Sequence, residues 1–135
     1  MAPWIGGVFK TTNNGNTFEP VFDRQDNLSI GGISIAHSSS TIVWVGSGDA
    51  YTSRSSIAGD GVYKSTDAGL TWKNMGLADS HHIAKIAIPP SNPDIVYVAT
   101  MGHLYSTNNE RGIYKTTNGG GTWEKMLPAW SFATT

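Results

Sequence analysis

The chain has 135 residues, of which 14% are charged, and its formal net charge is −1. This length predicts one small domain, and the near-neutral charge gives no reason to expect binding to nucleic acid or to an anionic membrane surface. The absence of cysteine excludes disulfides, thiolate metal ligands and cysteine nucleophiles. No apolar stretch is long enough to span a membrane, and no signal peptide is visible.

The first part of the chain, residues 1–27, predicts half of a repeating unit followed by a connection. Residues 1–6 show no periodic pattern. Residues 7–22 place two short alternating runs around an Asn-Asn-Gly turn, which is typical of a β-hairpin. The connection that follows, DRQDNLS, is charged.

Residues 28–80 and 81–127 predict two complete units of four antiparallel strands each. Residues 30–49 (IGGISIAHSSSTIVWVGSGD) align without a gap with residues 83–102 (IAKIAIPPSNPDIVYVATMG). Each of these stretches predicts a strand, a tight turn and a second strand, after which a longer connection leads to a hairpin. The second strand is almost continuously apolar, which is typical of a strand buried on both faces. The tail, residues 128–135, has no counterpart in the other units.

The hairpin of every unit contains one short motif, which we call the box. It reads GVYKSTDAGLTW in residues 61–72, with the pattern S-x-D-x-G-x-T-W, and recurs as GVFKTTNNGNTF (7–18) and GIYKTTNGGGTW (112–123). The acid position is Asp in one copy and Asn in two, so the side-chain oxygen is kept and the charge is not. A hydrogen-bonded turn needs only that oxygen, whereas a catalytic acid or a strong cation ligand, the alternative for Asp67, needs the charge. We therefore expect a structural role for the box residues, which are Thr11, Asn13, Gly15, Ser65, Asp67, Gly69, Trp72, Thr116, Asn118, Gly120 and Trp123.

Repeats of four antiparallel strands over ~40–50 residues are typical of the blades of a β-propeller. The sequence therefore predicts an all-β fold, a partial β-propeller of about two and a half four-stranded antiparallel blades. A closed propeller has roughly 4–8 blades, and each blade needs a neighbour to cover its apolar faces. The expected partners are the remaining blades of a longer protein or other copies of this chain.

The box carries a resemblance to a known family. Residues 61–72 are similar to the Asp-box, or bacterial neuraminidase repeat. The strings GDGVYKSTDAGLTWKNMGL and HIAKIAIPPSNPDIVYVATMGHLYSTNNERGIYKTTNGGGTWEKML resemble the sortilin N-terminal-domain type of propeller, and the likeness covers about residues 5–127. This resemblance implies a fragment of a longer bacterial propeller, in the periplasm or outside the cell, that hydrolyses glycans or acts as a receptor-like module.

Blade connectivity divides the loops of such a propeller between two rims. The box turns lie on one rim, and the connections 23–29, 49–60, 76–80 and 102–111 lie on the other. All three arginines are in these connections, whereas the lysines lie elsewhere. Arginine offers a planar fork for carboxylates and hydroxyl pairs, and tyrosine offers a flat apolar face with a polar end. The candidate ligand-binding residues are Arg24, Tyr51, Arg54, His103, Tyr105 and Arg111, and the alternative is a set of solvated loops.

We interpret the chain as part of a binding or interaction module that recognises a peptide or a glycan on this second rim. The alternative is part of a glycoside hydrolase of the xyloglucanase or sialidase type, with Asp49, Asp60 and Glu110 as candidate acids, because that reaction requires two carboxyl groups. A third interpretation is a polypeptide without a function of its own. His81 and His82 point to opposite faces of a strand, so we expect no metal site, and nothing indicates a cofactor.

Overall fold

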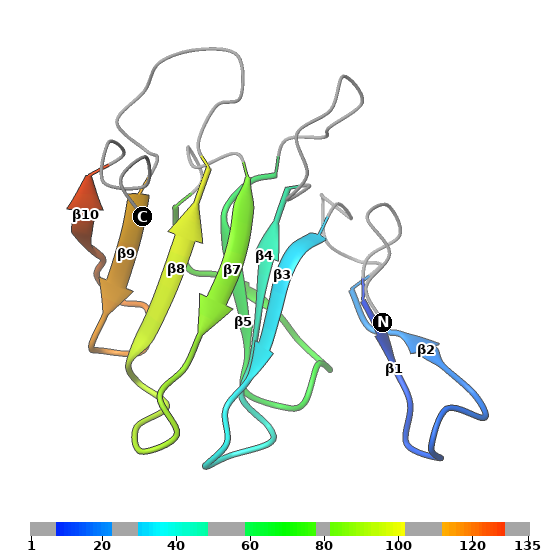
Figure 1. Cartoon of the computed structure of the whole chain (residues 1–135). Coiled ribbons are helices and arrows are strands. Elements are labelled where there is room, and N and C mark those ends of the chain that lie inside the picture. Colours follow the sequence, from blue (N-terminus) through cyan, green and yellow to red (C-terminus); the bar gives the residue numbers. More distant parts are fainter. Residues whose placement is uncertain (1–7, 23–29, 49–58, 78–81, 102–111, 129–135) are drawn as a thin grey trace.

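The computed structural model describes residues 8–22, 30–48, 59–77, 82–101 and 112–128. These residues form three antiparallel sheets that follow one another in chain order (Figure 1). The first sheet consists of β1 (Phe9–Lys10) and β2 (Glu19–Pro20). The second sheet consists of β3 (Ile30–Ile35), β4 (Val43–Ser47), β5 (Val62–Ser65) and β6 (Lys73–Asn74). The third sheet consists of β7 (Ile83–Ala87), β8 (Val96–Thr100), β9 (Gly112–Thr116) and β10 (Glu124–Pro128).

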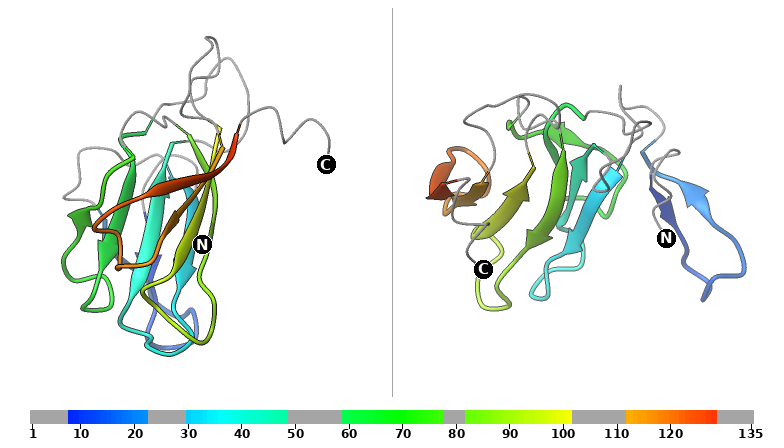
Figure 2. Two further views of the ribbon diagram at one scale, coloured as in Figure 1. Left: turned by 90° about the vertical axis from the view of Figure 1, so that its left-hand side faces the viewer. Right: turned by 45° about the horizontal axis from the view of Figure 1, so that its top comes forward.

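Each four-stranded sheet is a meander in which every strand pairs with its neighbours along the chain. Two further views show the same succession of twisted sheets (Figure 2). The described residues contain no helix, so the prediction of an all-β fold built from antiparallel four-stranded units is confirmed. In this described part there is accordingly no helix long and apolar enough to cross a membrane.

The second and third sheets repeat one another in register. Ile33 lies opposite Val45 in the second sheet, and Ile86 lies opposite Val98 in the third. The pairing also shifts at the same place in both sheets, directly after the first residue of β3 and of β7. The gapless alignment of the sequence therefore identifies residues that occupy equivalent positions in space.

Two hydrophobic clusters join neighbouring sheets. One lies between the first and second sheets and contains Val8, Phe22, Ile30, Val43, Val45 and Tyr63. The other lies between the second and third sheets and contains Trp44, Val62, Ile83, Ile86, Val96 and Val98. Strands β4 and β5 of the second sheet therefore bury residues on both faces, each against a different neighbour, whereas Ile33 and Ile35 of β3 are exposed.

A comparison of the equivalent strands β4 and β8 shows how a neighbouring sheet changes the burial of a strand. All five residues of β4 are buried, as its continuous apolar sequence predicts. In β8 only alternate residues are buried, and Tyr97 is 36% exposed whereas the equivalent Trp44 is fully buried. Trp44 meets Trp123 of the third sheet edge to face, with ring centroids 5.8 Å apart. No sheet within the described part of the chain covers the face of β8 that bears Tyr97, so this face is open.

Glycine allows the second and third sheets to approach closely. A β-carbon on Gly46 of β4 would lie 2.2 Å from Cγ2 of Ile83, and one on Gly31 of β3 would lie 1.9 Å from the Ile83 carbonyl oxygen. Both distances are far below van der Waals contact. The inner strands β3 and β4 therefore pack against β7 only because these two positions carry no side chain.

The tryptophan that ends each of the last two boxes forms a hydrogen bond to the preceding sheet. Trp72 Nε1 donates to the carbonyl oxygen of Val21 at 2.6 Å, and Trp123 Nε1 donates to that of Met75 at 2.8 Å. Val21 and Met75 occupy equivalent positions, so the same bond joins both pairs of neighbouring sheets. The first box ends in Phe18, which has no donor and is 51% exposed.

A lysine of each of the first two box strands forms a second bond, in the opposite direction along the chain. Lys10 Nζ donates to the carbonyl oxygen of Ala68 at 3.1 Å, and Lys64 Nζ donates to that of Gly119 at 3.2 Å. Each lysine thus reaches into the box turn of the following sheet. Together the tryptophan and the lysine make the box a connector between sheets, a role that its sequence did not reveal.

Replacing Trp72 by Phe tests this connection. The ring remains, but the Val21 carbonyl loses its donor, so we expect a loss of about 1 kcal/mol in the free energy of unfolding and a fall of roughly 4 °C in Tm. Phe18→Leu is the matched control, because it changes an exposed ring at the equivalent position of the first box. Equal effects of the two substitutions in thermal melts would contradict the role of the indole bond.

Candidate functional site

Most residues of the predicted ligand-binding rim lie outside the described part of the chain. They stay predictions, and they are Asp49, Glu110, Arg24, Tyr51, Arg54, His103, Tyr105 and Arg111. Asp60 is the one candidate acid that is described. It lies two residues before β5, whereas the turn of the second box follows β5, so Asp60 and the box turn lie at opposite ends of that strand.

Asp60 is held by hydrogen bonds at the corner between β4 and β5. Its Oδ2 accepts a bond from Tyr63 Oη at 2.6 Å, and its Oδ1 lies 3.1 Å from Ser47 Oγ. The backbone N–H of Asp60 donates to Ser47 Oγ at 2.8 Å. The Ser47 hydroxyl is also 2.6 Å from the carbonyl oxygen of Gly61, and its single proton serves one acceptor at a time.

The equivalent corner of the third sheet is built without a carboxylate. Thr100 Oγ1 donates to the carbonyl oxygen of Gly112 at 3.3 Å and accepts the N–H of Gly112 at 3.1 Å. The hydroxyl at this position therefore closes the corner in both sheets. Asp60 adds a carboxyl group to one of them, and the Tyr63 hydroxyl holds its Oδ2.

The three boxes share one hydrogen-bond network. In the second box Ser65 Oγ donates to Asp67 Oδ1 at 2.7 Å and accepts the N–H of Gly69 at 2.8 Å. Asp67 Oδ1 also accepts the N–H of Thr71 at 2.8 Å. The same three bonds recur in the first box, among Thr11, Asn13, Gly15 and Thr17, and in the third, among Thr116, Asn118, Gly120 and Thr122.

One bond of the network reverses its direction between Asp and Asn. Thr71 Oγ1 donates to Asp67 Oδ2 at 2.6 Å, whereas Asn13 Nδ2 donates to Thr17 Oγ1 at 2.7 Å. A threonine hydroxyl can do either, so both residues complete the turn. The carboxylate and the amide are therefore interchangeable in this geometry, and the turn itself does not require the charge.

The charge of Asp67 is nevertheless stabilised by its surroundings. The hydrogen bonds from the side chain and backbone of Thr71, and then from Ser65, lower the pKa of Asp67 from 3.8 to about 2. A carboxylate with such a low pKa is a poor general acid or base near neutral pH. The chemistry of the box turn is therefore suited to a structural role.

The box turn is also anchored within its own sheet. The N–H of Ala68 donates to the carbonyl oxygen of Thr41 at 2.9 Å, and that of Gly119 donates to the carbonyl oxygen of Asp94 at 3.0 Å. Thr41 and Asp94 lie in the turns that follow β3 and β7. These bonds place the box turn beside the first turn of each sheet, as the connectivity predicts.

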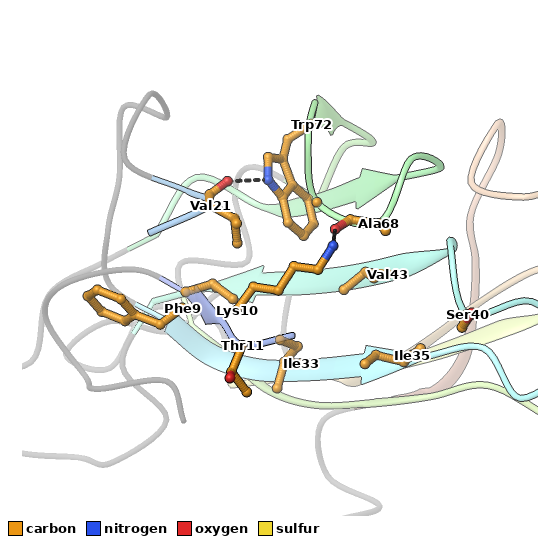
Figure 3. A pocket seen from close by; sticks show the side chains of 12 residues that line it. Phe9, Lys10, Thr11, Val21, Ile33, Ile35, Ser40, Val43, Ala68 and Trp72 are labelled. Carbon is orange, nitrogen blue, oxygen red and sulfur yellow. Dashed lines mark hydrogen bonds between the residues drawn. The ribbon is translucent and has the colours of Figure 1, made fainter. Parts of the chain in front are cut away.

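A groove of about 290 Å³ opens beside β1 and β3 (Figure 3). The sticks in Figure 3 show Phe9 and Lys10 on one side, Ile33 and Ile35 on another, and Trp72 above. The lining is mainly apolar. The sequence did not predict this groove, because the groove depends on which described strands lie beside β1 rather than on any motif.

The described residues contain no group of three or more His, Asp or Glu side chains that could hold a metal ion. They also bring no second candidate acid to Asp60, since its proposed partners, Asp49 and Glu110, lie outside these residues.

Comparisons with known proteins identify the architecture. No family model matches the chain, and no curated protein matches it in sequence. Among solved structures, an ancestral GH74 enzyme matches 94% of the chain with a TM-score of 0.67 and 21% identity. A GH74 xyloglucanase from Xanthomonas campestris matches 87% with a TM-score of 0.58 and 16% identity. The chain is a partial β-propeller.

This propeller comprises about two and a half blades, with the second and third sheets as complete blades and the first sheet as half of one. The chain spans 16% and 18% of the length of the two GH74 chains. The similarity to them is one of fold. The narrower likeness to the bacterial neuraminidase repeat and to sortilin-type propellers stays a prediction.

Substitution of Asp67 tests the role of the box. Because its pKa is lowered in the folded state, the ionised group adds stability above about pH 3.8, and this stability is lost as the pH falls toward 2. We expect the Tm of Asp67→Asn at pH 7 to lie within a few degrees of that of the unsubstituted chain. This difference in Tm should vanish as the pH falls from 3.8 to 2.

Asp67→Ala is the matched comparison, since it removes the acceptor for Ser65 and Thr71 in every protonation state. It is expected to lower Tm more than Asp67→Asn at every pH in this range. If both variants were equally damaging at pH 7, the charge rather than the turn geometry would be the important property of the box.

Proposed function

We propose that this chain is part of a propeller glycoside hydrolase that acts on a polysaccharide of the xyloglucan class. The observation that carries the proposal is the match of nearly the whole chain to two GH74 propellers, one of which is described as a xyloglucanase. This favours the hydrolase interpretation over a general interaction module. The likeness is one of fold, so the activity and substrate rest on the chemistry that the second rim supplies.

The chemistry of glycoside hydrolysis sets what that rim must contain. Two carboxyl groups are needed, about 5–5.5 Å apart for retention of configuration and roughly 6.5–9.5 Å apart for inversion. Asp60 lies at the end of β5 that is opposite to the box turn, where we expect a site formed by loops. Asp49 and Glu110 are the partners that the sequence offers, and neighbouring blades of a longer protein are the other source.

The box rim is the less suitable place for a substrate. Its hydroxyl, carboxylate and amide groups already bond to one another in all three copies. A sugar would have to displace these internal bonds. The sequence instead assigns Tyr51, Arg54, His103, Tyr105 and Arg111 to connections that we expect on the opposite rim, and binding residues are disproportionately found in loops.

A second candidate function is a binding module that recognises a glycan or a peptide without cleaving it. The geometry of Asp60 favours it, because its Oδ2 accepts the Tyr63 hydroxyl at 2.6 Å and the carboxyl group is thereby held at the corner of its own sheet. A residue used in this way positions a loop and does not need to exchange a proton. Under this proposal the same rim binds the ligand, and no reaction follows.

Binding of oligosaccharides tests the proposal on the chain itself. We expect xyloglucan oligosaccharides to bind in calorimetry, and the double substitution Tyr51→Ala/Arg54→Ala to weaken binding by about tenfold or more, since a charge-assisted hydrogen bond contributes ~1.5–3 kcal/mol. Asp67→Asn, on the opposite rim, is the control and should bind normally. Binding that is unchanged by the double substitution would contradict the proposal that this rim binds the ligand.

Release of reducing ends separates the two candidate functions. Hydrolysis of xyloglucan that is abolished by Asp49→Asn or Asp60→Asn would establish the enzyme, whereas binding without release from the full-length protein would favour the module. Because Asp60 also bonds to Tyr63, Tm is measured alongside, and Tyr63→Phe serves as the control for loss of that bond alone. Failure to bind any β-glucan would contradict both proposals for a glycan ligand.

A further inference from the structure

The groove beside β1 lies where a complete blade has its two inner strands. The first sheet consists of β1 and β2, which correspond to the outer strands β5 and β6 of the second sheet. In the second sheet two further strands, β3 and β4, precede this pair and pack against the third sheet. Nothing in the described residues occupies the corresponding place beside the first sheet.

Equivalent residues show that this place is uncovered. Ile33 of β3 is 44% exposed, whereas the equivalent Ile86 of β7 is 5% exposed because β3 and β4 cover it. Ile35 is 55% exposed, whereas the equivalent Ile88 packs against the cluster between the second and third sheets. The groove thus continues an interface that the chain itself builds one blade further on.

The neighbouring strand edge is open as well. β5 pairs with strands on both of its sides, and so does β9, whereas among the described residues β1 pairs only with β2. Phe9 on β1 is 37% exposed, and the equivalent Tyr63 is 5% exposed. An open edge beside an apolar surface is the arrangement that accepts an added strand.

We propose that this groove binds an antiparallel pair of β-strands built like residues 30–47 of this chain, which pairs with the open edge of β1 and covers Ile33 and Ile35. The polar groups of the groove argue against a sugar as the occupant. Lys10 Nζ already donates to Ala68, and Trp72 Nε1 already donates to Val21 (Figure 3). An occupant therefore meets mainly apolar surface and the backbone edge of β1.

The close approach of the sheets adds a sequence requirement. Gly31 and Gly46 let β3 and β4 approach Ile83, and Ile30 is the residue equivalent to Ile83 in the second sheet. The occupant therefore needs glycine at the positions of Gly31 and Gly46. Residues 30–47 meet this requirement, whereas residues 83–100 carry Ala84 and Ala99 there.

Thiol labelling at the groove tests the proposal. The chain has no cysteine, so Ile33→Cys introduces a single reporter thiol. A synthetic peptide of residues 30–48 at ten times its Kd should slow the reaction of this groove thiol with a thiol reagent about tenfold. The same peptide with Gly46→Ala should protect at least tenfold less well, and the chain variant Leu70→Cys, at an 81% exposed position, should label at the same rate throughout.

An isolated hairpin is only marginally stable, so the free peptide can fail to form strands. A fused hairpin therefore provides a second test. A copy of residues 28–60 placed directly before Gly7 supplies the pair at high effective concentration. Protection of the groove thiol and a raised Tm, both lost on Gly46→Ala in the copied segment, would support the proposal.

Three results would overturn it. The first is labelling of the groove thiol that stays rapid both when the peptide is present and in the fusion. The second is protection of the unfused chain that grows with its own concentration, which would make a second copy the occupant. The third is protection by xyloglucan oligosaccharides but not by the hairpin. The proposal concerns blade assembly, so it stands or falls separately from the glycan-binding rim.

Discussion

Burial of both faces of a sheet is the constraint on which the rest of this structure depends. In the second sheet β4 is covered on both sides, and every one of its residues is buried. The third sheet is covered on one side, and β8 alternates between buried and exposed residues. A strand sequence that is apolar on both faces is thus stable only between neighbours, and the box supplies the directional bonds of that stacking through Trp72, Trp123, Lys10 and Lys64.

This constraint explains why the box, the most prominent motif of the sequence, is not the best candidate for an active site. The box gathers a hydroxyl, an acid and an indole within a short span, as an active site would. Its polar groups satisfy one another in all three copies, and its indole and lysine serve the neighbouring blade. The connections between the opposite ends of these strands contain all three arginines of the sequence. The box rim therefore has a structural role, and recognition at the opposite rim remains our proposal.

The sequence predicted what is local and repeated. The alignment of residues 30–49 with 83–102 anticipated the equivalent registers of β3–β4 and β7–β8, and the exchange of Asp67 for Asn13 and Asn118 anticipated a turn that needs an oxygen rather than a charge. It did not predict the bond from Trp72 to Val21 or the groove at Ile33, since both depend on how separate units stack. The invariant lysine of the three boxes was visible, but its acceptor lies in another blade. The ligand-binding rim stays a prediction, because it depends on loops with no repeated pattern.

Hydrogen exchange of the backbone amides tests the central claim, that each blade is stabilised chiefly by its neighbours, most directly. The amides of β4 and β5 lie in the sheet covered on both faces and are predicted to exchange most slowly. Those of β8 and β9 are predicted to be intermediate, and those of β1 and β2 to exchange fastest. Equal protection of β4 and β8, or greatest protection in the first sheet, would show that the blades are stable on their own and would contradict this account.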